Sequence, residues 1–515
     1  MSNNTRTKNS IINSSYAVLN KIATVILSFI VRTIFIKVLT SEYLGINGLF
    51  SNIITMLSLA DLGIGIAIPY TLYKPLAENN QLKIKVLMKL YGKIYNIIGI
   101  IVLVIGISIT PFLHFFIKEM PGIENLNGIY ILFVINTAIS YFFSYKKLLL
   151  DSDQRGYIAN KIVMYVTICI SILQILVLYF TRNYITYLLI GILSVFLQNL
   201  LISLKCNKEY PYIKQKTKEK ISGEDIKQLK QNVSSLLIYR IGIVLLNGTD
   251  NLIISKMIGI IEVGVYSNYL MITNALSTII SQIFTAITSS IGNMVIEASG
   301  DKSEEILKKL QFLDFWLYSI CSLCIFVGIN YFIRLWIGEE YVLSNATAFM
   351  ISLNFYIYGM QSVISSFRDA YGLFAQGKYR PIVMVIVNLV LSIALARYLG
   401  VLGVVIGTVV SRLFVIGIWD PIVVYRFGIK KSVKFYFVRY YKYLFLFIAL
   451  LVMAFILMGQ LNIADFISWG ILMFVLFIVS NIIYIIIFHN KEEFKYFYKV
   501  VKNIIHKIID RIRKG

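Results

Sequence analysis

The sequence predicts an all-α membrane protein that crosses the bilayer many times, with about 14 transmembrane helices. Hydrophobic residues make up 58% of its 515 residues and charged residues only 15%, which is far from the balance of a soluble domain. Apolar segments of about 20 residues recur along the whole chain, and each can cross a hydrocarbon core of about 30 Å as a helix. These segments are too long, and alternate too little, to be the strands of a membrane barrel.

Hydropathy places the expected spans along the chain. They are 14–39, 44–73, 90–117, 127–145, 158–180, 184–204, 233–257, 263–295, 310–335, 346–372, 381–398, 401–424, 437–458 and 464–488. The pair 381–398 and 401–424 could also form one long hairpin. The polar N-terminus continues directly into the first span, so no cleavable signal peptide is expected.

A long basic loop, Lys205–Lys230, separates the sixth and seventh spans. It is the expected linker between two six-span halves. We therefore expect an N-terminal lobe with this linker, a C-terminal lobe, two extra spans and a tail. Their expected bounds are 1–231, 232–426, 427–490 and 491–515.

The net charge of +23 follows the expected topology. If the N-terminus is cytoplasmic, most of the 49 Lys and Arg residues fall on cytoplasmic segments, and external connections such as "TSEYLG" carry almost none. The basic charge then reflects membrane orientation and attraction to anionic membrane lipids, and nucleic acid is not expected as a partner. Both termini are expected in the cytoplasm.

The last segment, "KEEFKYFYKVVKNIIHKIIDRIRKG", is too polar to span a membrane. Its apolar residues recur at steps of three and four, with Lys and Arg on the other face. This pattern is typical of an amphipathic helix that lies on the cytoplasmic leaflet. A solvated helix or a helix bound to a partner is the alternative.

Signatures of catalysis and of cofactor binding are missing from the sequence. Cys321 and Cys324 form a CxxC inside an apolar span without a His or acidic partner, so helix packing explains them better. The three histidines match no zinc spacing, and there is no Walker loop. Since no loop is long enough to hold a soluble catalytic domain, we expect no enzyme, no catalytic residue, no metal site and no cofactor.

Polar residues inside the spans are the candidate functional residues. Arg32 lies in "TVILSFIVRTIFIKVL", where an Arg at the bilayer centre costs roughly 2.5–3.5 kcal/mol. Lys21, Thr24, Ser28 and Arg32 share one helix face. Comparable stripes occur in other spans: Asn47, Ser51, Thr55, Ser58 and Asp61; Arg240, Asn247 and Asn251, with Asp250 beside them; Asn274, Ser277, Ser281, Thr285 and Thr288; and Thr408, Ser411 and Arg412.

Each stripe also has a structural interpretation. Hydroxyl residues let helices approach and hydrogen-bond across their interface, and Lys21, Arg32 or Arg412 could extend toward the headgroups. Asp61 and Asp250 have short side chains, which favours a water-filled cavity or a cationic partner. Together the stripes predict an internal aqueous cavity with more cations than anions.

A weak repeat links the two halves. Leu39–Ile53 can be aligned with Ile258–Ile272 by placing Gly45 on Gly264, which also puts Gly48 on Ser267. The two segments stand at equivalent places in the two six-span halves. Repeated halves with a site between them are the usual construction of transporters.

One stretch resembles a known family. "SEYLGINGLFSNIITMLSLADLGIGIAIPYTLYKPLAENN" (Ser41–Asn80) resembles the second-span signature of bacterial polysaccharide-unit flippases of the Wzx type. These belong to the multidrug/oligosaccharidyl-lipid/polysaccharide exporter superfamily. Glu262–Leu276 and Gly377–Arg412 look like the same family, although their patterns are shared more widely across the superfamily. The resemblance covers essentially the whole chain.

The resemblance implies a MATE-like fold with two six-helix lobes around a central cleft and two extra C-terminal helices. Such proteins carry an undecaprenyl-diphosphate-linked oligosaccharide outward across the bacterial cytoplasmic membrane by alternating access, for capsule or cell-surface polysaccharide synthesis. A polymerase and other polysaccharide-assembly proteins are implied as partners. A cationic cavity suits this substrate, because a diphosphate that leaves water needs positive partners.

The family has no strict motif, so the site residues are chosen by position. The candidates for substrate binding are Arg32, Arg240, Arg412, Asn47, Ser51 and Asn247. The candidates for ion coupling are Asp61 and Asp250.

Two other functions remain open at this point. A MATE-type cation-coupled drug exporter would be expected to have an acidic cavity. A polyprenyl-phosphate-dependent membrane glycosyltransferase or polymerase would need a sizeable external loop with carboxylates or Arg clusters, and the short "TSEYLG" loop argues against it.

Overall fold

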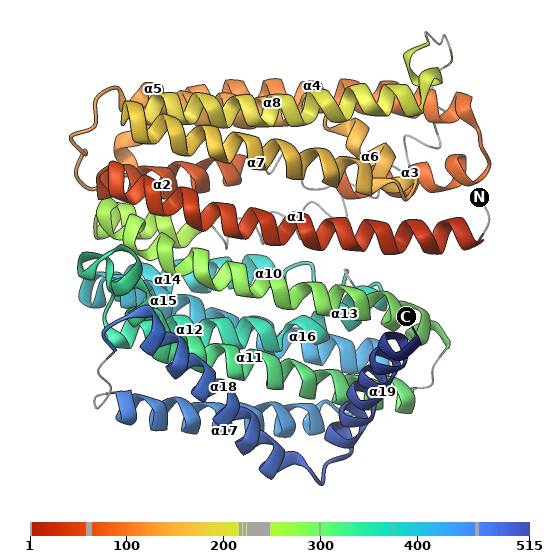
Figure 1. Cartoon of the computed structure of the whole chain (residues 1–515), viewed down its shortest axis with the longest axis vertical. Helices are drawn as coiled ribbons and strands as arrows, with labels where there is room; N and C mark the ends of the chain where they lie inside the picture. Colours follow the sequence, from red (N-terminus) through yellow and green to blue (C-terminus); the bar gives the residue numbers. More distant parts are fainter. Residues whose placement is uncertain are drawn as a thin grey trace. The chain divides into compact units, whose positions relative to one another are not determined.

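The computed structural model describes residues 3–57, 64–215, 219, 223, 248–297, 300–373, 375–458 and 463–514. Within these ranges the regular secondary structure is helical throughout (Figure 1). Nine of the described helices are long and apolar enough to cross a membrane, or ten if the bent pair of α5 and α6 counts as one span. The chain is therefore a polytopic all-α membrane protein, as the hydropathy pattern predicts.

The chain divides into two units, residues 1–267 with 396–400 and residues 268–395 with 401–515. The boundary that the sequence predicts, between residues 231 and 232, lies outside the described residues. The first unit contains α1 (Asn3–Val38), α2 (Ser41–Leu57), α3 (Ile64–Ala77), α4 (Gln81–Ile109), η2 (Thr110–Phe115), α5 (Leu126–Tyr141), α6 (Tyr145–Ser152), α7 (Gly156–Thr181), α8 (Tyr184–Glu209), η3 (Pro211–Lys214), a helical stretch at 248–257 and the first turns of α10 (Ile260–Glu297).

The second unit contains the rest of α10 and the later helices. These are α11 (Gly300–Ile337), η4 (Glu339–Tyr341), α12 (Asn345–Met360), α13 (Ser362–Ala370), α14 (Arg380–Leu399, with its last turn assigned to the first unit), α15 (Val401–Ser411), the π-helical turn η5 (Arg412–Ile416), α16 (Gly417–Val423), the π-helical turn η6 (Val424–Ile429), α17 (Lys434–Met458), α18 (Phe466–Phe488) and α19 (Glu492–Lys514).

Local chemistry sets several helix starts. The side chains of Asn80, Asn125, Asn183 and Ser344 accept hydrogen bonds from backbone N–H groups in the first turns of α4, α5, α8 and α12. Asp465 begins α18 in the same way and forms a capping box with Ser468. Such caps satisfy donors that the helix itself leaves without partners. They explain why the spans begin where they do.

Two regions of the second unit compare informatively with the expected spans. The expected span 346–372 is broken at Gln361 into α12 and α13. The expected spans 381–398 and 401–424 are separate helices that meet at Gly400, whose φ of 59° lies in the left-handed region that favours glycine. The seventh expected span, 233–257, lies mostly outside the described residues.

The helix α11 forms the centre of the second unit. It packs against α12, α13, α17, α18 and α19, and 72% of its most apolar window is buried. The ring of Phe315 stacks on Tyr443 with centroids 4.4 Å apart and also packs against Tyr484 and Phe488. Aromatic packing of this kind contributes beyond simple burial, so α11 is a rigid support for the elements around it.

The tail forms the helix that its pattern predicts. Near its start, Phe494 stacks on Trp316 of α11, and the ammonium of Lys309 lies 4.5 Å from the ring centroid of Tyr496. Hence α19 begins against α11 around the start of the expected span 310–335. Its position on the cytoplasmic leaflet stays a prediction.

Candidate substrate site

The two glycines that align in the repeat meet in the first unit. A Cβ atom on Gly45 of α2 would lie 1.9 Å from the carbonyl oxygen of Ile260, and one on Gly264 would lie 3.0 Å from the backbone nitrogen of Gly45. Only glycine allows the start of α10 to approach α2 this closely. One turn further, Gly48 faces Val263 and Ser267. This close approach sets the position of Ser267.

Arg32 of α1 reaches Ser267. Its side chain is half-buried, and Nη2 donates a hydrogen bond to Ser267 Oγ. The hydroxyl of Ser267 in turn donates to the carbonyl of Gly264 at 2.7 Å. Because the Ser267 hydroxyl proton is used in this bond, the lone pairs of Ser267 Oγ are left to accept from the Arg32 guanidinium. The arginine is thus held inside the protein by a residue 235 positions away.

Aromatic side chains from α8 complete this group. Phe35 lies 5.6 Å from Tyr184 and 5.5 Å from Tyr187 between ring centroids, and Tyr43 lies 5.0 Å from Tyr184. The charge of Arg32 acts electrostatically on both α8 phenols. We call Arg32, Asn47, Tyr184, Tyr187 and Ser267 the Arg32 site.

Asn47 joins the Arg32 site through Tyr184. It is half-buried, and its Nδ2 donates to the phenol oxygen of Tyr184 at 3.3 Å. The structure therefore brings together two of the candidates that the sequence selected, Arg32 and Asn47, and adds Tyr184, Tyr187 and Ser267. In the sequence, Tyr184 and Tyr187 lie about one turn apart, which could have indicated a shared site. At the start of a span, however, tyrosines are also typical of the aromatic belt at the membrane interface.

The chemistry of the Arg32 site suits an anionic, oxygen-rich ligand. Guanidinium groups bind phosphate oxygens through paired N–H donors. Phenol and amide groups exchange hydrogen bonds with hydroxyls, and the tyrosine rings offer flat apolar surface. The same set of groups can contact a diphosphate and the sugar attached to it.

Arg412 of the second unit opens the π-helical turn η5 and is half-buried. Its guanidinium carbon lies 5.0 Å from the ring centroid of Tyr358, and its carbonyl oxygen accepts a hydrogen bond of 3.1 Å from Gln361 Nε2. A π-helical turn inside a membrane helix is often found at functional sites. Arg412 stays a candidate for substrate binding.

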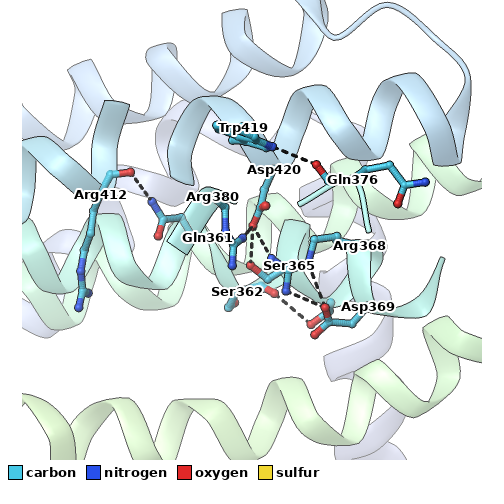
Figure 2. A network of polar contacts seen from close by, with 11 residues as sticks. Gln361, Ser362, Ser365, Arg368, Asp369, Gln376, Arg380, Arg412, Trp419 and Asp420 are labelled. Carbon is cyan, nitrogen blue, oxygen red and sulfur yellow. Dashed lines mark hydrogen bonds and ion pairs between the residues drawn. The ribbon is translucent and has the colours of Figure 1, made fainter. Parts of the chain in front are cut away.

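A buried ionic network, absent from the sequence predictions, joins α13, α14 and α16 (Figure 2). Asp420 Oδ2 accepts hydrogen bonds from Arg368 Nη1 at 3.0 Å, from Arg380 Nη1 and from Ser365 Oγ at 3.3 Å. Arg368, Arg380 and Asp420 are respectively 2%, 4% and 0% exposed. The second carboxylate, Asp369, binds Arg368 at 2.6 Å. Buried charges persist when they are paired in this way.

Two of the remaining candidates lie within the described residues. Ser51 is exposed, and Asp250 is half-buried in the helical stretch at 248–257. Arg240, Asn247 and Asp61 lie outside the described residues. In the part of the chain that the structure describes, no three His, Cys, Asp or Glu side chains cluster as a metal site would require.

Comparison with solved structures identifies the architecture. The lipid II flippase MurJ, in an inward closed conformation, superposes with a TM-score of 0.62 and 13% identity, over 92% of this chain and 99% of that one. An inward-facing MATE family transporter of the MOP superfamily gives 0.58 and 15%, over 78% and 94%. A MATE transporter of Vibrio cholerae gives 0.58 and 14%, over 83% and 100%.

The chain has the fold of MATE transporters and MurJ. The identities are low, so the likeness is one of fold. No protein-family model and no curated protein sequence matches the chain. The MATE-like architecture expected from the resemblance of Ser41–Asn80 is confirmed.

Proposed function

We propose that this chain is a flippase that moves an undecaprenyl-diphosphate-linked oligosaccharide repeat unit across the bacterial cytoplasmic membrane by alternating access. The observation that carries the proposal is the Arg32 site, a guanidinium held among hydroxyl, phenol and amide groups in a membrane helix. The sequence resemblance to Wzx-type flippases and the fold shared with MurJ, a flippase for lipid II, support it.

The energetics of the substrate favour a cationic site. A diphosphate that leaves headgroup water loses strong hydrogen bonds, and a guanidinium can replace them with charge-assisted ones. An Arg at the bilayer centre also costs roughly 2.5–3.5 kcal/mol during insertion. A diphosphate that binds Arg32 therefore recovers part of the free energy that it loses on leaving water. A cationic drug would gain nothing from this residue, which makes the MATE-type drug exporter the weaker alternative.

The wider proposal follows the same assignment. Arg412 would contribute a second cation to the substrate path, and Asp61 and Asp250 remain candidates for ion coupling. Both termini and the loop at 205–230 would lie in the cytoplasm, and the chain would work with a polymerase and other polysaccharide-assembly proteins. The proposal includes no catalytic residue.

The test compares Arg32→Ala with Lys21→Ala in cells that lack the wild-type gene. Lys21 lies on the same face of α1 but is exposed, so it serves as the matched control. We expect Arg32→Ala to lose export and to accumulate lipid-linked oligosaccharide on the cytoplasmic side, while Lys21→Ala exports normally. Arg32→Lys should keep part of the activity if charge suffices, and little if paired phosphate contacts matter.

Two results would contradict the proposal. Normal export by Arg32→Ala, at wild-type protein abundance, would remove Arg32 from the substrate path. Export of cationic drugs without any change in lipid-linked oligosaccharide would favour the drug exporter.

A further inference from the structure

A buried carboxylate on α11 has no role in the function proposed above. Asp314 is 0% exposed and lies in a helix long and apolar enough to span the membrane. Both residues that donate to it are neutral. Ser362 Oγ donates to Oδ1 at 2.8 Å and to Oδ2 at 3.1 Å, and the backbone N–H of Val363 donates to Oδ2 at 3.2 Å.

Such surroundings suit a group that binds and releases a proton. An ionised carboxylate is costly to bury among neutral groups, whereas the carboxylic acid is not. Acidic residues inside membrane helices often belong to proton pathways for this reason. The step is simple: Asp314 accepts one proton from water on a carboxylate oxygen and later returns it.

Among the described residues, further polar groups near Asp314 come from α11 and α17. On α11, Gln311 and Tyr318 lie about one turn to either side. On α17, Tyr436 is within electrostatic range of Asp314, and Arg439 Nε donates to Gln311 Oε1 at 2.6 Å. The charged residues of α13 lie at its far end. The N-terminus of α13 is therefore the element that hydrogen-bonds directly to Asp314, so a change in the charge of Asp314 acts on it first.

The two ends of α13 are held by different partners. Its far end is fixed by Arg368, which pairs with the buried Asp420 of α16. Its N-terminus is held by Asp314, whose negative charge complements the unpaired N–H groups of the first turn. Adding a proton to Asp314 removes that charge and weakens its hydrogen bonds to the N-terminus of α13, while the Arg368–Asp420 pair at the far end is unchanged.

The break before α13 connects this end to Arg412. Gln361 is the single residue between α12 and α13, and its Nε2 donates to the Arg412 carbonyl at the start of the π-helical turn. The Arg412 guanidinium stacks over Tyr358, one turn before the break. Ser362 is thus adjacent to Gln361, the residue that hydrogen-bonds to Arg412, so a movement of Ser362 can shift Arg412.

We infer that Asp314 is a proton-binding residue that couples proton movement to transport, acting through the N-terminus of α13 and Gln361 on Arg412. The inference rests on the proposed transport function and names the proton as the coupling ion. It adds a residue to the ion-coupling candidates Asp61 and Asp250.

The first experiment measures proton binding without a substrate. Infrared difference spectra of the purified full chain in lipid nanodiscs, recorded across a pH titration, should show the carbonyl band of a buried carboxylic acid. The band should disappear in Asp314→Asn and persist in Asp369→Asn, a matched control that removes a half-exposed carboxylate of the same helix network. Ser362→Ala removes a donor to the carboxylate and should move the titration midpoint upward by about one pH unit.

The second experiment measures coupling in proteoliposomes with an imposed pH gradient. Asp314→Asn should lose gradient-driven movement of lipid-linked oligosaccharide but keep exchange at equal pH, and Asp369→Asn should keep both. A titrating band unchanged in Asp314→Asn would overturn the inference, as would full gradient-driven transport by that variant. If the wild-type chain moves no lipid-linked oligosaccharide, the proposed function fails, and the infrared titration alone decides whether Asp314 binds a proton.

Discussion

Replacing Gly45 by alanine should open the contact between α2 and the start of α10. The added Cβ would lie 1.9 Å from the carbonyl oxygen of Ile260, where ordinary contact begins at 3.4 Å. The obstacle is backbone, which cannot rotate aside as a side chain does. The two helices would have to separate by about 1.5 Å, the difference between these two distances.

The magnitude can be bounded. Overpacking a well-packed site costs about 1–3 kcal/mol, and a clash with backbone belongs at the upper end. Alanine returns about 0.5–1 kcal/mol through its higher helix propensity. We expect a net loss of about 2 kcal/mol for Gly45→Ala. Gly264→Ala, at 3.0 Å from backbone, should cost less, and Gly48→Ala, at 3.1 Å from the movable Val263 side chain, should cost least.

The assay is thermal unfolding of the detergent-solubilised protein, followed by tryptophan fluorescence at fixed detergent and lipid content. Gly470→Ala on α18 is the matched control, because nothing lies within 4 Å of its added Cβ. The order of Tm should be Gly470→Ala highest, then Gly48→Ala, Gly264→Ala and Gly45→Ala. Equal Tm values for Gly45→Ala and Gly470→Ala would refute the reasoning.

Further predictions concern topology, the buried ionic network and the Arg32 site. A cysteine introduced at Lys216, in the basic loop, should resist a membrane-impermeant reagent applied outside intact cells and react once the membrane is opened; labelling from outside would reverse the proposed orientation. Asp420→Ala should cost about 3–5 kcal/mol because Arg368 and Arg380 lose the carboxylate they share, whereas Asp369→Ala, at a side chain 50% exposed, should cost about 1 kcal/mol or less. Equal unfolding temperatures for these two variants would show that Asp420 does not hold the network. Tyr184→Phe should weaken export by roughly fivefold, from the loss of one hydrogen bond of about 1 kcal/mol, and unchanged export would remove this phenol from the Arg32 site.

The amino-acid sequence by itself determined the class of the protein and the course of its helices. Hydropathy is a local property, and a segment such as Phe466–Phe488 must form its own backbone hydrogen bonds in lipid wherever its neighbours lie. The alignment of Gly45 with Gly264 also carried information, because close approach of two helices needs glycine at the contact.

Only the tertiary structure decided which polar side chains meet. Arg32 stood out in the sequence, but its partner Ser267 is 235 residues away, and nothing local distinguishes that serine from others in the same span. Arg380 directly precedes the expected span 381–398, and only its contact with Asp420 places it in a buried network. Asp314 lies inside the expected span 310–335, but its contacts depend on a helix break at Gln361 that no proline marks. A charge inside a membrane protein takes its role from the group that faces it, and that depends on how distant helices pack.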